Sequence, residues 1–214
     1  MTEQIAYWNR VAEDKIFTHP LNTDWLQKHV PLSSAVLDLG CGYGRNCNEM
    51  KQLGYQDIIG IDNAEKMILR GKRLYPNLDL RVMRSSPTDF DDKSFDLILL
   101  FAVLTCLVDN HDQNALMAEV SRLLRPGGML YLSDFPVQSD RRNRNRYEKY
   151  RHRFANYGTF ALPEGVVVRH LERDRIQSLL EGFHSLETAN IPIKTMNNHS
   201  AEAFQYLGRK SVSK

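Results

Sequence analysis

Three glycines at alternating positions are the strongest chemical signal in this sequence. In the segment Val36-Leu37-Asp38-Leu39-Gly40-Cys41-Gly42-Tyr43-Gly44-Arg45, a short apolar strand runs directly into them. Glycine adopts positive φ and has no Cβ, so the backbone N–H groups of such a turn can approach a ligand closely. A helix from about Arg45 that stops at Gly54 would complete a strand, turn and helix, which is typical of nucleotide-binding α/β folds.

Two aspartates and the glycine spacing discriminate between nucleotide-like ligands. The spacing is GxGxG, and the dinucleotide fingerprint would require glycine where Arg45 stands. Asp62 ends a second apolar strand at 58–61, at the interval where a carboxylate reaches a ribose diol. Asp38 precedes the first glycine, and a carboxylate there stabilises an ammonium or sulfonium rather than a pyrophosphate. Together these features favour S-adenosylmethionine over NAD.

Four motifs, in this order, resemble those of the class I S-adenosylmethionine-dependent methyltransferases. They are VLDLGCGYGR at 36–45, IIGIDNAEKMI at 58–68, SFDLILL at 94–100 and LLRPGGMLYLSD at 123–134. The resemblance implies an α/β fold with a Rossmann-like, doubly wound sheet of seven strands. The sheet is expected to be mostly parallel, with the last strand antiparallel and helices on both faces. It also implies S-adenosylmethionine as cofactor and S-adenosylhomocysteine as product.

The expected cofactor site lies at the carboxyl ends of the first strands. Its residues are predicted to be Tyr7, Asp38, Gly40, Cys41, Gly42, Gly44, Asp62, Asn63, Met67, Ser85, Ser86, Phe101 and Ala102. Asp38 is expected to face the ammonium of the cofactor, and Asp62 its ribose hydroxyls. Many relatives accept the adenine amino group with an acidic residue after the third strand. Because Arg84 or Ser85 stands there, adenine recognition is assigned to Ser85, Ser86 or backbone.

The remaining elements are predicted from periodicity and from capping residues. Helices are expected at 3–15, 22–28, 64–69 (capped by Asn63), 112–124 and 173–183, and strands at 78–83, 129–133, 186–194 and 203–210. The whole chain, 1–214, is expected to form one domain. Within it, 1–30 would supply helices that cover the cofactor, and 136–165 a lid inserted over the substrate.

The 136–165 insertion combines basic and aromatic residues. Its basic residues are Arg141, Arg142, Arg144, Arg146, Lys149, Arg151 and Arg153, and its aromatic ones include Tyr147, Tyr150, Phe154 and Tyr157. One interpretation is a lid that attracts an anionic substrate, or less readily RNA. The other is a solvated helix face whose arginines pair with carboxylates elsewhere. The sequence leaves both open.

Methyl transfer to a hydroxyl or ammonium acceptor requires removal of a proton, so a base is expected near the methyl group. In a parallel sheet the site lies at the carboxyl ends of the strands, and the topology brings 169–170 and 196–199 to that end. His170 and His199 are therefore the predicted catalytic residues. The predicted substrate-binding residues are His19, Tyr157, Arg169 and Asn197.

The spacing of the cysteines, the motifs and the net charge disfavour several functions. Cys41, Cys47 and Cys106 show no metal-ligand spacing, so no metal is expected and arsenic methylation is disfavoured. The fourth strand is not followed by an Asn-Pro-Pro-Tyr or Asp-Pro-Pro-Tyr tetrad, which disfavours methylation of base nitrogens. The net charge of +2 does not indicate a polyanion-binding protein, so nucleic acid is not an expected partner. No membrane segment or signal peptide is evident, so a cytoplasmic location is expected.

The sequence thus predicts an enzyme that methylates a small molecule at O, N or S, with an anionic substrate as one option. Two alternatives stay open. The first is an RNA or protein methyltransferase that uses the basic insertion, and the second is a non-catalytic regulator that binds the cofactor. The sequence does not indicate the oligomeric state.

Overall fold

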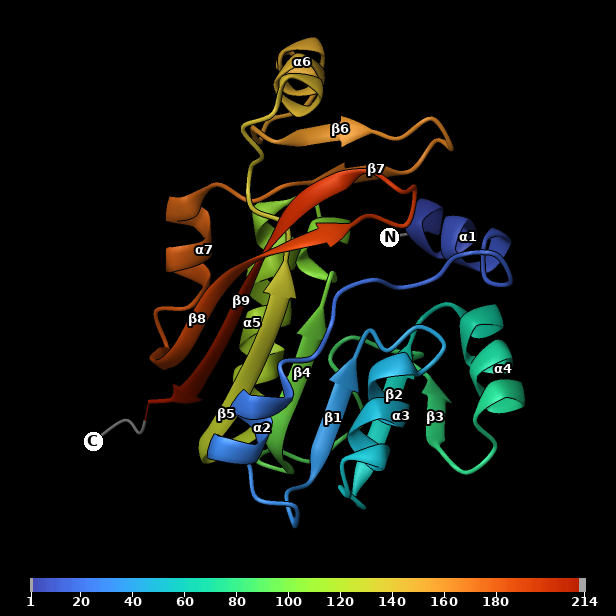
Figure 1. The fold of residues 1–214 in the computed structure, drawn as a ribbon, viewed down its shortest axis with the longest axis vertical. Helices are drawn as coiled ribbons and strands as arrows, with labels where there is room; N and C mark the ends of the chain where they lie inside the picture. The colour runs from blue at the N-terminus through green and yellow to red at the C-terminus, as the bar shows by residue number, and fades with distance from the viewer. Residues whose placement is uncertain (1, 212–214) are drawn as a thin grey trace.

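A computed structural model describes residues 2–211 of the chain (Figure 1). Its helices are α1 (Thr2–Arg10), α2 (Thr23–His29), α3 (Arg45–Gln52), α4 (Glu65–Leu74), the short 3-10 helix η1 (Leu104–Cys106), α5 (Asn110–Leu123), α6 (Arg141–Tyr150) and α7 (Arg173–Leu179). Its strands are β1 (Val36–Leu39), β2 (Ile58–Asp62), β3 (Asp79–Val82), β4 (Phe95–Phe101), β5 (Leu124–Asp134), β6 (Thr159–Ala161), β7 (Val167–Arg169), β8 (Phe183–Lys194) and β9 (Ser200–Lys210).

The main sheet has seven strands in the order β3-β2-β1-β4-β5-β9-β8. The neighbours from β3 to β5 pair in parallel, and β9 runs antiparallel to β5 and to β8. This arrangement confirms the predicted sheet. The carboxyl ends of β1, β2, β4 and β5 consequently meet at one edge, where the glycine turn, Asp62 and Phe101 lie.

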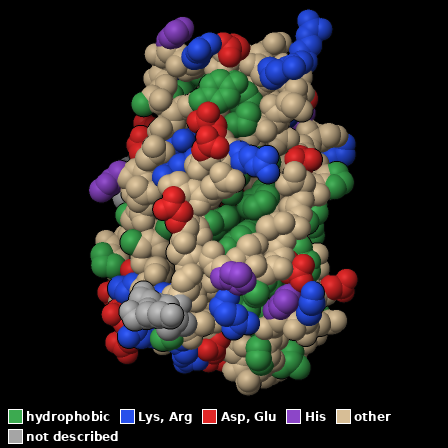
Figure 2. Space-filling model, turned by 90° about the vertical axis from the view of Figure 1, so that its left-hand side faces the viewer, with side chains coloured by type: hydrophobic (Ala, Val, Ile, Leu, Met, Phe, Trp, Pro, Cys, Tyr) green, Lys and Arg blue, Asp and Glu red, His purple; other side chains and the backbone are tan. Residues whose placement is uncertain are grey.

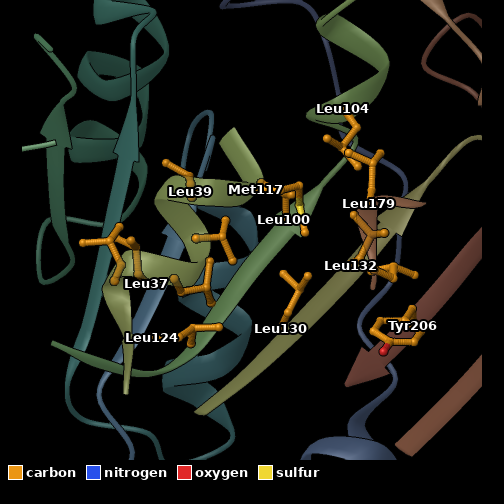
Figure 3. Close-up of a cluster of buried hydrophobic side chains, with 14 of the residues drawn as sticks. Leu37, Leu39, Leu100, Leu104, Met117, Leu124, Leu130, Leu132, Leu179 and Tyr206 are labelled. Atoms are coloured by element: carbon orange, nitrogen blue, oxygen red, sulfur yellow. The ribbon is translucent and has the colours of Figure 1, made fainter. Parts of the chain in front are cut away.

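Alternate residues of the central strands face two different hydrophobic clusters, because side chains in a strand alternate between faces. Leu37, Ile98 and Leu130 pack on one face with α5 and α7 (Figure 3). Their neighbours in sequence, Val36 and Leu97, pack on the other face with residues of α2, α3 and α4. The sheet is therefore covered by helices on both faces, as predicted.

The insertion after β5 forms a separate layer beyond the carboxyl edge of the sheet. It contains α6 and the two-stranded antiparallel sheet of β6 and β7, which lie at the top of Figure 1. A bridge between Pro136 and Leu171 joins the two ends of the insertion. Helix α1 lies at the same edge of the main sheet (Figure 1).

Several predicted boundaries need correction. Helix α1 ends at Arg10 rather than at 15, and α7 ends at Leu179 because Phe183 already pairs with Lys210 in the final hairpin. The fifth strand begins at Leu124, so the Pro-Gly-Gly segment belongs to β5. The N-cap residue of α4 is Ala64 and not Asn63.

Helix α2 does not cover the cofactor edge, so that part of the prediction for 1–30 is wrong. Trp25 instead packs on the ring of Tyr131 in β5, with 5.8 Å between centroids. The backbone N–H of Asn22 donates to the Tyr131 hydroxyl at 2.7 Å, and the Asn22 side chain caps the helix. Burial of an apolar helix face on the sheet determines where α2 lies.

Candidate active site

A cavity of about 720 Å³ lies between the carboxyl edge of the sheet, helix α1 and the insertion. This volume is within the range of small-molecule sites in proteins. The lower part of its wall comes from the glycine turn and the ends of β2 and β4. The upper part comes from α6, from β6 and β7, and from the turn between β8 and β9.

The glycine turn forms the floor of the cavity. Gly40, Gly42 and Gly44 have φ values of 83°, 56° and 80°, in the left-handed region that glycine tolerates best. A Cβ on Gly42 would lie 2.0 Å from Cε2 of Phe17, so only glycine fits beneath that ring. Gly44 is the N-cap residue of α3 and does not line the cavity, which corrects its predicted role as a cofactor contact.

Asp62 connects the glycine turn to the end of β2. Its Oδ2 accepts from the Gly42 N–H at 2.9 Å, and its Oδ1 accepts from the Ala64 N–H at 2.7 Å. Each carboxylate oxygen has a second lone pair, so Asp62 can still accept hydroxyl hydrogen bonds from the cavity side. Asp62 thus orders the turn and lines the cavity at the same time.

Most of the predicted cofactor residues lie on the cavity wall. These are Tyr7, Gly40, Cys41, Gly42, Asp62, Asn63, Met67, Ser86, Phe101 and Ala102. Ser85 does not line the cavity, because it is exposed and its hydroxyl donates to Asp89 Oδ1 at 3.3 Å. Of the two serines predicted to contact adenine, Ser86 lines the cavity and Ser85 does not.

Asp38 does not line the cavity, although its Oδ1 is buried without a hydrogen-bond partner among residues 2–211, so its contact with the cofactor ammonium stays a prediction. Its Oδ2 accepts from the Cys47 thiol at 3.4 Å, and its side chain is buried. Burial raises the pKa of Asp38 to about 7. Its position beneath the turn indicates a role in supporting the loop.

The wall carries buried polar atoms that a ligand could satisfy. Within residues 2–211, the Tyr7 hydroxyl, His19 Nε2 and Asn46 Oδ1 are buried without a hydrogen-bond partner, and all three residues line the cavity. Buried polar groups in folded proteins are normally paired, so such atoms mark ligand contacts. Asn46 was not predicted; its only sequence signal is its place in the first turn after the glycines.

His170 lies on the upper wall, as the topology predicted. It is 7% exposed, and its ring stacks on Phe135 with 5.2 Å between centroids. Its Nδ1 is 2.6 Å from the Tyr147 hydroxyl. Burial, together with Arg146 and Arg142, lowers the pKa of His170 to about 3. The imidazole is therefore neutral at physiological pH, and too weak a base for the role predicted from the sequence.

His199 and Asn197 line the same part of the cavity, from the turn between β8 and β9. His199 is exposed, and burial together with Arg142 and Arg146 lowers its pKa. The Asn197 amide oxygen accepts from the Lys15 ammonium, and its Nδ2 donates to Glu164 Oε1 at 3.0 Å. Asn197 therefore links the N-terminal segment to the insertion.

His19 lines the cavity from the segment between α1 and α2. Its Nδ1 shares a hydrogen bond with Ser133 Oγ at 2.9 Å, and its ring meets Phe135 edge-on. Burial, together with the nearby Arg45, lowers the pKa of His19 to about 4. A neutral imidazole with one unpartnered nitrogen thus faces the cavity.

Two of the predicted substrate residues do not line the cavity. Arg169 is buried, and its guanidinium donates to the Val108 carbonyl at 3.2 Å and to Asn110 Oδ1 at 2.7 Å. It therefore fastens β7 to the start of α5. Tyr157 is 37% exposed on the far side of the insertion, where its ring packs near Tyr147.

The insertion contributes two arginines, Arg142 and Arg146, to the wall, although seven basic residues lie between 141 and 153. They are one helical turn apart, so they share a face of α6. The sequence indicated the basic cluster but did not predict that these two of its members line the cavity. The remaining five are not on the cavity wall.

The part of the chain that the structure describes contains no group of three or more His, Cys, Asp or Glu residues able to hold a metal ion. Nor does any described helix have the length and apolar character needed to cross a membrane. Cys41 and Cys106 line the cavity as free thiols, and burial raises the pKa of both.

Comparison with known proteins agrees with this geometry. Residues 36–128 match the family described as "Methyltransferase domain". This match, together with the sheet order and the glycine turn, supports the resemblance to the class I S-adenosylmethionine-dependent methyltransferases. A structure described as a SAM-dependent methyltransferase from Methanosarcina mazei superposes with a TM-score of 0.82 at 23% identity, covering 88% of this chain and 97% of that one.

Curated relatives match over shorter stretches. An arsenite methyltransferase of Aquipseudomonas alcaligenes is 34% identical over 122 residues, covering 50% of this chain and 34% of the relative. The eEF1A lysine and N-terminal methyltransferase of Bos taurus is 29% identical over 113 residues, covering 48% of this chain and 16% of the relative. The chain spans less than half the length of the first curated relatives it matches.

Proposed function

We propose that this chain transfers the methyl group of S-adenosylmethionine to a small-molecule acceptor bound under the insertion. The cofactor supplies an electrophilic methyl on its sulfonium. The glycine turn would hold its methionine portion, Asp62 its ribose hydroxyls, and Ser86 together with the backbone its adenine. The unpartnered Tyr7 hydroxyl and Asn46 oxygen are available for its polar groups.

The observation that carries this proposal is that cofactor wall and insertion enclose one cavity. Gln4 donates to the Val167 carbonyl and Arg10 to the Glu164 carbonyl, so α1 is fastened to the insertion. Lys15 adds an ion pair with Glu164 at 3.4 Å. The insertion, joined to α1 by these contacts, covers the cavity like a roof. Such a covered cavity suits a compact acceptor better than a polymer, because the acceptor must be enclosed with water excluded.

The charge pattern on one face of the molecule supports the same choice. Acidic and basic side chains are interspersed on the face that includes α7 and β8, seen at the left of Figure 1 (Figure 2). A face of this kind does not resemble a nucleic-acid footprint, which needs clustered Lys and Arg.

Arsenite is a poor fit as the acceptor. Cys41 and Cys47 are buried, and the pKa of each thiol is raised. Thiolates are the form that binds a metalloid, so this environment opposes binding. An organic acceptor at O, N or S is the better fit.

His199 is the proposed base for an acceptor that must lose a proton. It lines the cavity, is exposed, and its ring makes no hydrogen bond among the described residues. His199→Ala should then lower turnover about a hundredfold while leaving cofactor affinity unchanged. A thiolate acceptor would need no base, and wild-type turnover in this variant would point to that chemistry.

The test combines calorimetry with a labelling experiment. S-adenosylhomocysteine should bind the purified protein, and label from S-adenosylmethionine should enter small metabolites when the protein is incubated with fractionated cell extract. Label in protein or RNA would instead establish a macromolecular acceptor. Cofactor binding without transfer to any fraction would favour a regulator that only binds the cofactor.

A further inference from the structure

The two wall arginines of the insertion are free to bind a ligand. Neither Arg142 nor Arg146 makes an ion pair or a side-chain hydrogen bond with the residues the structure describes. The Arg146 guanidinium lies over the Phe160 ring, 4.3 Å from its centroid, which orients it without using its donors. Burial and Arg142 lower the pKa of Arg146, and Asp140 opposes this shift, so the two cations lie close to each other.

One carboxylate, that of Asp140, lies near the two arginines but does not line the cavity. Asp140 accepts from the Asn143 backbone and side chain as the N-cap residue of α6. The acidic residues on the cavity wall, Glu3, Asp62, Asp109 and Asp112, belong to α1, to the end of β2 and to the start of α5. The part of the cavity wall that comes from α6, β6 and β7 therefore carries two cations and no carboxylate, while Asp140 lies near them without lining the cavity.

The hydrogen bonds around Tyr147 determine the tautomer of His170. The backbone N–H of Gln138 donates to the Tyr147 hydroxyl oxygen at 3.1 Å. Among the described residues the phenol hydrogen has no acceptor other than His170 Nδ1, which is 2.6 Å away, so Nδ1 is assigned as the acceptor. The neutral ring consequently carries its proton on Nε2, and presents a hydrogen-bond donor rather than a base to the cavity.

We propose that Arg142, Arg146 and the Nε2–H of His170 form a receptor for an anionic group, so that the methyl acceptor is an organic carboxylate or phosphate. The body of this acceptor would lie against the apolar wall of Phe135, Phe160 and Val166. The inference rests on the proposed function, because it names the substrate class of the same cavity. Guanidinium groups bind carboxylate and phosphate with charge-assisted hydrogen bonds, and a neutral imidazole N–H adds a third donor.

The binding test uses the protein saturated with S-adenosylhomocysteine and three probes of similar shape: benzoate, phenyl phosphate and neutral benzamide. Calorimetry should show benzoate or phenyl phosphate binding at least about tenfold more tightly than benzamide, and the preferred anion identifies the group. Arg142→Gln and Arg146→Gln should each remove about tenfold of that affinity. Arg144→Gln, on the exposed side of the same helix, is the matched control and should bind like the wild type.

A second measurement is independent of any substrate. Nitrogen NMR of the imidazole rings should show His170 protonated at Nε2 only, and Tyr147→Phe should remove this preference.

Three outcomes of the calorimetry would overturn the receptor: equal affinity for benzamide and for both anions, no binding of either anion, or an equal loss of affinity in Arg144→Gln. Because S-adenosylhomocysteine must already be bound in each titration, such a failure is separate from a failure of the cofactor site.

Discussion

The neutral, buried state of His170 predicts how the stability of the protein depends on pH. The pKa of this side chain falls from 6.5 to about 3 on folding. Between these values the unfolded chain binds a proton that the folded protein does not, so the free energy of unfolding decreases as pH falls. The contribution of His170 is fully present above about pH 6.5 and is lost progressively toward pH 3.

The magnitude follows from the two pKa values. At pH 5 an imidazole of pKa 6.5 is mostly protonated in the unfolded chain, and the folded ring is almost entirely neutral. This difference in protonation lowers the free energy of unfolding at pH 5 by about 2 kcal/mol relative to pH 8. Asp38 and Asp134, whose burial raises each pKa to about 7, act with the opposite sign, so a wild-type pH profile alone would mix these effects.

The variant His170→Asn isolates the contribution. The Asn oxygen lies near the position of Nδ1 and can accept the same bond from Tyr147, but the side chain does not titrate. Urea unfolding at pH 8 and pH 5 should show the stability of the wild type relative to this variant falling by about 2 kcal/mol at the lower pH. His184→Asn, on the exposed surface of β8, is the control. An unchanged difference between wild type and His170→Asn at the two pH values would refute a neutral buried imidazole.

Three further predictions concern the cofactor wall and the insertion. Gly42→Val should abolish calorimetric binding of S-adenosylhomocysteine, because a Cβ there would lie 2.0 Å from the Phe17 ring and displace the wall; retained affinity would contradict this. Asp62→Ala should weaken the same binding by about 1.5 to 3 kcal/mol, and NADH should not compete in wild type. Arg169→Ala should lower stability in urea unfolding by about 1 to 3 kcal/mol and leave the Michaelis constant unchanged, since its guanidinium joins β7 to the Val108 carbonyl and to Asn110. A raised Michaelis constant in a stable Arg169→Ala protein would restore its predicted substrate role.

Much of the cofactor edge could be predicted because its signals are local. The glycines of the turn need positive φ, and all three have it. The apolar strand before the turn and the carboxylate that ends β2 also follow from short stretches of sequence. The final hairpin was predicted in the same way, from alternating apolar residues.

The direction of individual side chains could not be predicted from these stretches. Asp38 lies within β1 and Asp62 ends β2, yet Asp62 lines the cavity and Asp38 does not. Arg169 and His170 are adjacent in a short strand and its exit, and only His170 reaches the cavity. Neighbouring residues of extended chain point to opposite sides, so an error of one position exchanges a site residue for a structural one.

By itself, the sequence determined the class of fold and the place of the cofactor edge, because turns, strands and helix ends are encoded by nearby residues. Only the tertiary structure decided which two of seven basic residues in the insertion face the cavity, and that His170 is held as a donor by Tyr147. These outcomes depend on contacts between segments far apart in the chain, and on the burial that those contacts create. The chemistry of the acceptor site therefore arises from packing, while the cofactor turn arises from local backbone geometry.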